Sequence, residues 1–122
     1  MLNNANGIDH IYIACGYTDL RSGIDRLVGL VQSSFKLDPY QNSLFLFCGR
    51  RTDRIKGLLW EGDGFLLLYK RLETGSFQWP RSERDLKELT DQQFRWLTEG
   101  LCIEQQRAIP KVYPGTYSVF CL

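Results

Sequence analysis

Residues 54–72 read RIKGLLWEGDGFLLLYKRL, and this stretch decides how the chain folds. Two apolar runs flank the sequence Glu61-Gly62-Asp63-Gly64, which is the strongest turn signal in the chain. Asp-Gly between two strands favours a type I′ turn, with either Asp63-Gly64 or Gly62-Asp63 as the two-residue loop. The stretch therefore predicts a β-hairpin, with strands over residues 54–60 and 65–72.

The two faces of this hairpin are predicted to differ in character. Both loop positions pair even-numbered residues of the first strand with odd-numbered residues of the second, and side chains alternate with a period of two. The better core face carries Ile55, Gly57, Leu59, Leu66, Leu68, Lys70 and Leu72. The other face carries Arg54, Lys56, Leu58, Trp60, Phe65, Leu67, Tyr69 and Arg71. This second face is apolar near the turn and basic at its far end.

Apolar residues before the hairpin predict two further strands and a helix. Residues 11–15 and 43–48 form short buried strands, each ended by a glycine. Between them, one helical face is formed by Ile24, Leu27, Val28, Val31 and Phe35. Thr18, Asp19 or Ser22 can cap the start of this helix.

The segment after the hairpin predicts a short strand and a second helix. Residues 77–79 are expected to form the strand, whereas the mixed charges of residues 81–88 are expected to be solvated. Thr90 and Gln93 have the spacing of a capping box at a helix start, and Gly100 is a natural C-terminal stop. The second helix is therefore expected to be short.

Together these elements predict an α+β fold. Its antiparallel sheet of four or five strands is packed by one long helix and followed by a short C-terminal helix. The length of 122 residues fits a single domain. We place that domain at residues 10–103, behind a leader of residues 1–9 and before a tail of residues 104–122, whose order the sequence does not decide.

The charge is nearly balanced over the whole chain but not along it. Fifteen Lys and Arg face fourteen Asp and Glu, so the formal net charge is +1, which excludes a polybasic protein. Residues 50–71 nevertheless hold six basic and three acidic side chains. The candidate contact residues of this basic hairpin are Arg50, Arg51, Arg54, Lys56, Tyr69, Lys70 and Arg71.

Three interpretations of this cluster stay open from the residues alone. Cations and aromatic rings on one sheet face suit the phosphates and bases of a nucleic acid. The same residue types form protein interfaces, in which Trp, Tyr and Arg are common anchors. They also occur at solvated strand ends, where long side chains cover the sheet and keep their charged heads in water. Lys70 is the weakest member of the cluster, since it lies on the opposite face.

No catalytic, cofactor-binding or metal-binding residue is predicted. The chain has four dispersed cysteines and a single histidine, His10, which are poor material for a zinc site. Its aspartates have structural explanations at helix starts and turns. No signal peptide, membrane-length apolar run or phosphate-binding loop is visible, and dispersed cysteines suit a reducing compartment. We therefore expect a cytoplasmic protein that does not contact a membrane.

Several short segments, in order and with similar spacing, resemble one protein family. They include residues 13–16, 18–21, 23–25, 37–39, 49–51, 53–56, 60–65, 70–73 and 89–90. The family is that of the small accessory protein, called TnpB, of the bacterial insertion sequences of family sixty-six. The resemblance covers about three-quarters of the chain, with Gly57-Leu58 and the tail from Glu104 as departures.

The resemblance implies a bacterial mobile element and a protein that assists its transposition. In such elements a separate, large transposase supplies the acidic catalytic residues, which implies that none is needed here. The implied partners are the co-encoded transposase, the other accessory protein of the element and the DNA of the terminal inverted repeats. Two alternatives remain: a module that binds only protein, and a metal-dependent nuclease that would depend on Asp53.

Overall fold

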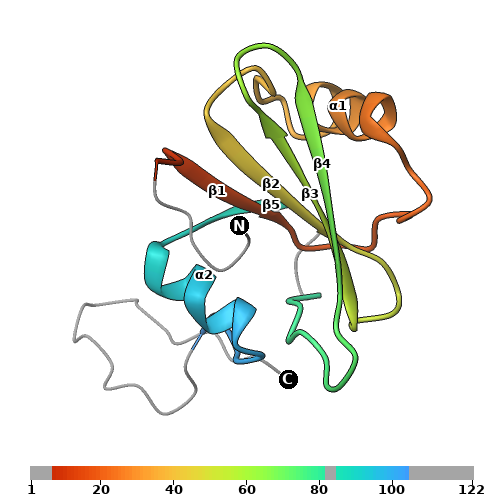
Figure 1. Cartoon of the computed structure of the whole chain (residues 1–122), viewed down its shortest axis with the longest axis vertical. Coiled ribbons are helices and arrows are strands. Elements are labelled where there is room, and N and C mark those ends of the chain that lie inside the picture. The colour runs from red at the N-terminus through yellow and green to blue at the C-terminus, as the bar shows by residue number, and fades with distance from the viewer. Residues whose placement is uncertain (1–6, 82–84, 105–122) are drawn as a thin grey trace.

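The computed structural model describes residues 7–81 and 85–104 of the chain. Their elements follow the order β1 (His10–Ala14), α1 (Ile24–Ser33), β2 (Ser43–Cys48), β3 (Arg54–Trp60), β4 (Phe65–Arg71), β5 (Leu86–Leu89) and α2 (Asp91–Thr98). The strands form one sheet in the order β4-β3-β2-β1-β5 (Figure 1). The predicted α+β class, with five strands and two helices, is therefore confirmed.

The sheet is mixed, so the prediction of a purely antiparallel sheet is wrong. β1 and β2 run parallel, with Ile11 opposite Leu44, while the other neighbouring strands are antiparallel. Parallel neighbours need a crossover connection, which here contains α1. α1 has ten residues, so the expected long helix is also wrong. The apolar pattern marks a strand but carries no information about its direction.

The β3–β4 hairpin has the predicted alternation of faces and a different turn. Trp60 lies opposite Phe65, so the two-residue loop is Gly62-Asp63, the second of the two predicted positions. Gly62 has a φ of 89°, whereas Asp63 lies outside the positive-φ region. A type I′ turn requires positive φ at both central residues, so the turn matches type II′, which places glycine first.

α1 begins without any of the predicted side-chain caps. Gly23 is the N-cap residue, its backbone is extended, and no side chain accepts a hydrogen bond there. Ser22 is buried instead, and Thr18 and Asp19 lie in the preceding loop. The Thr18 N–H donates a 3.0 Å hydrogen bond to the carbonyl of Cys48, because this loop turns towards the sheet before the helix starts.

Residues 86–89 form an edge strand that the sequence patterns did not predict, while residues 82–84 of the expected solvated segment lie outside the described residues. β5 pairs antiparallel with β1 despite the two charged residues at its centre. The strand predicted at residues 77–79 does not form, although its two aromatic side chains are buried. The indole Nε1–H of Trp79 donates a 2.8 Å hydrogen bond to the Ala14 carbonyl and fixes this segment at the end of β1.

The predicted capping box of α2 is confirmed. Thr90 Oγ1 accepts a hydrogen bond from the backbone N–H of Gln93 at 3.1 Å, and Gln93 Oε1 accepts one from the Thr90 N–H at 3.0 Å. Gly100 follows the helix with a φ of 81°, which suits its predicted role as a stop. Phe94 and Leu97 are buried, so one face of this short helix anchors it to the core.

The two helices lie on opposite faces of the sheet (Figure 1). A separate hydrophobic layer packs each helix against its face. The layer beneath α2 includes Ile55 and Leu59 of β3, so the predicted core face of the hairpin is confirmed. The layer beneath α1 includes Leu58, Phe65 and Leu67 from the other hairpin face. The apolar end of that second face is therefore also core, and only its basic end is left for other contacts.

The described residues include parts of the predicted leader and tail. The Asp9 N–H donates a 2.9 Å hydrogen bond to the Asn42 carbonyl, which ties the chain before β1 to the chain before β2. Glu104, the first residue of the predicted tail, forms a 2.9 Å ion pair with Lys87 of β5. The rest of these two segments, residues 1–6 and 105–122, lies outside the described residues.

Candidate functional site

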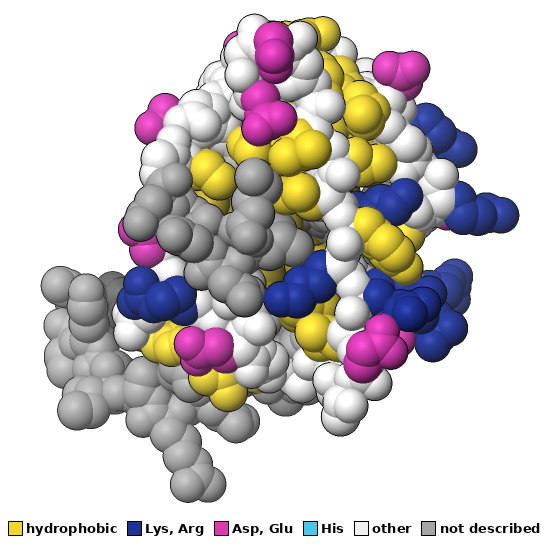
Figure 2. Space-filling model, viewed as in Figure 1, with side chains coloured by type: hydrophobic (Ala, Val, Ile, Leu, Met, Phe, Trp, Pro, Cys, Tyr) yellow, Lys and Arg dark blue, Asp and Glu magenta, His cyan; other side chains and the backbone are white. Residues whose placement is uncertain are grey.

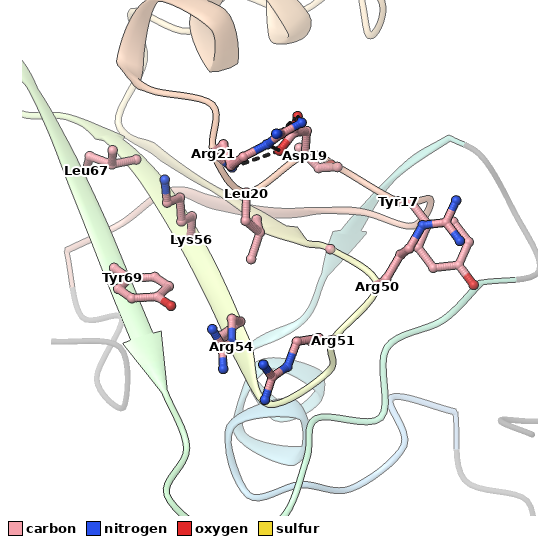
Figure 3. Close-up of a pocket in the computed structure, with 12 residues that line it drawn as sticks. Tyr17, Asp19, Leu20, Arg21, Arg50, Arg51, Arg54, Lys56, Leu67 and Tyr69 are labelled. Atoms are coloured by element: carbon pink, nitrogen blue, oxygen red, sulfur yellow. Dashed lines mark hydrogen bonds and ion pairs between the residues drawn. The ribbon is translucent and has the colours of Figure 1, made fainter.

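A cleft of about 890 Å³ lies on the sheet face that carries α1. It is formed by the parts of β3 and β4 that lie away from the hairpin turn, the loop after β2 and the loop between β1 and α1 (Figure 3). The lining residues are Tyr17, Thr18, Asp19, Leu20, Arg21, Gly49, Arg50, Arg51, Arg54, Lys56, Leu67 and Tyr69. The cleft therefore depends on the tertiary fold, because its parts are distant in sequence.

The lining of this cleft is strongly basic. Five of its side chains are cationic, and Asp19 is the one carboxylate among the twelve lining residues. Figure 2 shows Lys and Arg side chains gathered on the right-hand side of the molecule, where the loops before α1 and after β2 lie in Figure 1. The near-neutral net charge of the chain thus hides a local concentration of positive charge.

Backbone contacts hold the two loops of the cleft together. Beside the hydrogen bond from Thr18 to Cys48, Gly49 brings the two loops into close contact. A Cβ atom at position 49 would lie 3.2 Å from the Thr18 carbonyl oxygen and 3.3 Å from Leu20 Cγ. A residue without a side chain therefore allows this approach of the backbones.

Asp19 organises the loop before α1. Its Oδ1 accepts a hydrogen bond from the backbone N–H of Arg21 at 2.9 Å. Its carboxylate also accepts from the Arg21 guanidinium, at 3.0 Å from Nε and 2.8 Å from Nη2. These hydrogen bonds from Arg21 hold the pKa of the Asp19 carboxyl well below its usual range. Since the Arg21 side chain is 91% exposed, the pair shapes the loop more than it stabilises the fold.

Asp53 holds two of the predicted contact residues at the cleft. Arg54 donates from Nε and Nη2 to the two carboxylate oxygens at 2.9 and 3.2 Å, and Arg51 Nη2 lies 3.4 Å from Oδ2. The hydrogen bonds from Arg54 lower the pKa of the Asp53 carboxyl. Asp53 is thus an ionised partner of two guanidinium groups, which it holds in place beside the cleft.

Lys56 and Arg50 differ from the other cations of the cleft. No carboxylate among the described residues pairs with either of them. The Lys56 ammonium donates a 3.1 Å hydrogen bond to the Ser22 carbonyl and lies 6.0 Å from the centre of the Tyr69 ring. The Arg50 guanidinium lies 5.5 Å from the centre of the Tyr17 ring. Tyr17 is 65% exposed and Tyr69 is 55% exposed, so each cation lies beside an accessible ring.

Arg81 supports the wall of the cleft that Tyr17 forms. Its guanidinium carbon lies 4.0 Å from the centre of the Tyr17 ring, within the range of a cation–π contact. Its Nη1 donates a 3.0 Å hydrogen bond to the Gly16 carbonyl, and its Nη2 donates to the Gly49 carbonyl. One planar side chain therefore links the loop before α1, the loop after β2 and the Tyr17 ring.

The structure places five of the seven predicted contact residues in the lining, namely Arg50, Arg51, Arg54, Lys56 and Tyr69. Lys70 lies on the other face of the sheet, as the alternation predicts, and is opposite Ile55. Arg71 shares the face of Tyr69 but does not line the cleft, and its Nη2 lies 3.1 Å from Glu73.

The sequence patterns missed one side of the cleft. The loop of residues 17–21 is not among the predicted contacts, because Thr18 and Asp19 match a helix cap. The available signal is that residues 18–21 and 49–51 both belong to the segments that carry the family resemblance. Neither segment shows by itself that the two meet.

Within residues 7–81 and 85–104, no group of three His, Cys, Asp or Glu side chains is placed to hold a metal ion. Neither α1 nor α2 is long and apolar enough to cross a membrane. Cys48, the last residue of β2, is buried in the layer beneath α2, and burial raises the pKa of its thiol.

Fold and site together define a small α+β protein with a basic, aromatic-lined cleft on one face of a mixed sheet. Residues 9–108 match the family model described as IS66 Orf2 like protein. The chain belongs to this family, and the predicted resemblance is confirmed. Membership indicates an accessory role in the transposition of an insertion sequence.

Relatives of the chain include two uncharacterized proteins of Sinorhizobium fredii (strain NBRC 101917 / NGR234). The protein y4jC is 34% identical over 101 residues, which cover 83% of this chain and 86% of that protein. The protein y4hO is 36% identical over 91 residues, which cover 75% of this chain and 79% of that protein. No solved structure matches the chain.

Proposed function

We propose that this protein is a non-catalytic accessory factor of transposition and that its basic cleft binds the phosphate backbone of the element's DNA. The observation that carries the proposal is the pair of cations without a carboxylate partner, Arg50 and Lys56, each beside an exposed tyrosine ring. Such cations are available to phosphates, and such rings stack on bases or sugars.

The other cations of the cleft support the same function. Arg51 and Arg54 share the single carboxylate of Asp53, so part of their hydrogen-bonding capacity is left for a ligand. Asp53 is the residue on which a nuclease would depend, and its ion pairs with both arginines favour a structural role. The reaction itself is then left to the co-encoded transposase, which we propose as a partner in the cytoplasm.

A localised contact also fits the charge of the whole chain. A net charge of +1 gives little general attraction to nucleic acid, so binding depends on this cleft. The DNA we propose as the ligand is that of the terminal inverted repeats. Each phosphate that the cleft neutralises adds about −0.9 to the slope of log affinity against log salt concentration. We therefore expect tight binding at low salt that weakens strongly as the salt concentration rises.

The test is fluorescence anisotropy of labelled duplexes that carry the terminal repeats, over a series of salt concentrations. We expect Arg50→Gln and Lys56→Gln each to weaken binding and to reduce the salt slope by about one. Arg95→Gln is the matched control, because this substitution removes the same charge from an exposed cation on α2. Absence of binding by the unmodified chain at low salt, or equal loss in the control, contradicts the proposal.

A protein contact is favoured by a second observation, the aromatic cluster of Tyr40, Trp60 and Phe65. The ring centroids lie 5.0 Å apart for Tyr40 and Trp60, 5.2 Å for Tyr40 and Phe65, and 4.9 Å for Trp60 and Phe65. Tyr40 is 52% exposed, so the cluster presents rings of the types that anchor protein interfaces. We propose the co-encoded transposase or the other accessory protein of the element as the partner.

Co-purification with these two proteins tests the second contact. We expect capture that survives nuclease treatment and falls after Tyr40→Ala. Tyr17→Ala removes an exposed tyrosine from the cleft, on a loop outside β4, and serves as the matched control. If the unmodified chain, the Tyr40→Ala variant and the control variant are captured equally, the aromatic cluster is not part of the interface.

A further inference from the structure

The two edges of the sheet are protected very differently. β5 is an edge of only four residues, and its centre carries the charged residues Lys87 and Glu88. β4 is an edge of seven residues that pairs with β3 without interruption and contains no proline. Short length, charge, proline and bulges are the means by which natural edges avoid pairing. Over most of its length β4 has none of them, and its charges are confined to one end.

The hydrogen-bonding groups on the outer side of β4 follow from the hairpin. The Glu61 N–H donates to the Gly64 carbonyl, and the Leu72 N–H donates to the Asp53 carbonyl, so the even-numbered residues of the second strand bond to β3. The N–H and C=O groups that point outward belong to Phe65, Leu67, Tyr69 and Arg71. No residue in the described part of the chain pairs with this outer side, since β4 ends the sheet.

The side chains along this edge are apolar and only half-buried. Phe65, Leu66, Leu67 and Leu68 alternate between the two sheet faces, and all four are intermediate in exposure. Phe65 and Leu67 extend the layer beneath α1, whereas Leu66 and Leu68 extend the layer beneath α2. Both hydrophobic layers therefore end at the same edge with partly exposed side chains, and an added strand would extend both layers.

The charges at the two ends of β4 indicate which strand fits. The turn before the strand carries Glu61 and Asp63, whereas the strand ends with Lys70 and Arg71. Arg71 already has one carboxylate beside it, Glu73, and both side chains are largely exposed. A copy of the same strand in antiparallel orientation brings its acidic turn to this basic end, and the reverse holds at the other end.

We propose that two copies of the chain associate through their β4 edges, antiparallel, about a two-fold axis at Leu67. Outward-facing residues then pair with each other, which places Phe65 opposite Tyr69 and Asp63 opposite Arg71 of the second copy. Aromatic and opposite-charge cross-strand pairs are favourable. The result is one continuous ten-stranded sheet with both hydrophobic layers extended across the axis.

The dimer has a consequence for the cleft. Leu67 and Tyr69 line the cleft and also stand at the shared edge. A two-fold axis perpendicular to the sheet keeps both clefts on the same face, where they become neighbours. The dimer thus presents one symmetric basic surface, which consists of the cleft of each copy.

Measurement of mass in solution tests the dimer without any DNA. Light scattering of the full chain is expected to give twice 14.2 kDa, the mass of a single chain. Leu67→Pro removes an outward N–H and leaves the bonds to β3 in place, so we expect a folded monomer. A monomeric unmodified chain, or a dimer that persists in a Leu67→Pro chain with unchanged circular dichroism, overturns the proposal.

Oxidative cross-linking provides a second readout that does not depend on how proline is tolerated. Leu67→Cys places two thiols on the axis, at a separation that a disulfide can span. We expect a covalent dimer that the unmodified chain does not form under the same oxidation. Leu68→Cys is the matched control, because the pairing places that residue opposite Leu66 of the second copy. Equal cross-linking at position 68, or none at position 67, contradicts the pairing.

Discussion

Arg54 holds both carboxylate oxygens of Asp53, with Nε 2.9 Å from Oδ1 and Nη2 3.2 Å from Oδ2. The two residues are neighbours in the chain at the start of β3, and Arg51 shares the same carboxylate. The pair links a turn to the cationic lining of the cleft. Because the pair lowers the pKa of Asp53, it also makes the stability of the fold depend on pH.

Acid is expected to weaken the fold through this pair. The folded-state pKa of Asp53 is lowered from its ordinary value of 3.8, so its contribution to stability is present above that pH. It is lost as the pH falls through the folded-state value. We predict that Asp53→Asn lowers the melting temperature at neutral pH, and that the difference from the unmodified chain shrinks in acid.

Thermal unfolding followed by circular dichroism across the acid range checks this prediction. Asp9→Asn is the control, because Asp9 forms no ion pair among the described residues and precedes β1, away from the β4 edge. A constant difference between the Asp53→Asn chain and the unmodified chain at every pH would show that the ion pair contributes nothing.

Replacement of Arg81 is predicted to loosen the wall of the cleft. Arg81→Gln removes a charged donor from the Gly16 and Gly49 carbonyls, which costs about 1.5–3 kcal/mol for hydrogen bonds of this kind. Arg81→Lys keeps the charge but not the planar fork, so we expect most of the loss there as well. Urea unfolding measures the stability of both Arg81 variants. The control Arg95→Gln, at an exposed position, should change stability by less than about 0.5 kcal/mol. Full rescue by lysine would contradict the bridging role.

Loss of the capping box is predicted to destabilise α2. Thr90→Ala removes the hydroxyl that accepts from the Gln93 N–H, and such losses cost about 1 kcal/mol. Thr90→Ser keeps an acceptor at the same place and should retain nearly all of the stability. Urea midpoints of the three chains decide the matter, and equal midpoints for alanine and serine would remove the cap as the cause.

A methyl group at position 57 is predicted to overpack the centre of the hairpin. The Cβ of an alanine there would lie 3.2 Å from Leu44 Cδ1, 3.4 Å from Leu46 Cδ2 and 3.5 Å from Leu68 Cβ. Overpacking of a tight core costs about 1–3 kcal/mol. This crowding accounts for a glycine where the family resemblance led us to expect a bulkier residue.

Gly29→Ala is the natural comparison for Gly57→Ala. No atom lies within 4 Å of a Cβ built at Gly29, which is inside α1. Alanine is favoured over glycine in a helix by about 1 kcal/mol, so this variant should gain stability while Gly57→Ala loses it. Denaturation curves of the two variants with shifts of the same sign would refute the packing argument.

The hairpin and the second helix were predictable because their signals are local. The faces of β3 and β4 follow from a period of two, and Thr90 and Gln93 follow from a fixed spacing. The parallel pairing of β1 with β2 was not predictable, because an apolar run carries no direction. β5 was missed because Lys87 and Glu88 suggest a solvated segment, whereas its position at a sheet edge lets them reach solvent.

The same distinction applies to the cleft. Arg54, Lys56 and Tyr69 lie on one face of one hairpin, so alternation alone groups them. The loop of residues 17–21 joins them through contacts with the end of β2, some thirty positions away along the chain. No local pattern encodes that meeting, and the cap-like spacing before α1 points to a different role.

The position of β1 in the sheet has a consequence for the order of assembly on the ribosome. β2, β3 and β4 form a meander of neighbours, which can pair as soon as they emerge. β1 leaves the ribosome first, yet its outer partner is β5, and His10 contacts Glu88 across 78 positions. Contacts of such sequence separation form late and slowly. We therefore expect the nascent chain to hold a half-built sheet, with β1 as a temporary edge, until almost the whole described domain has been synthesised.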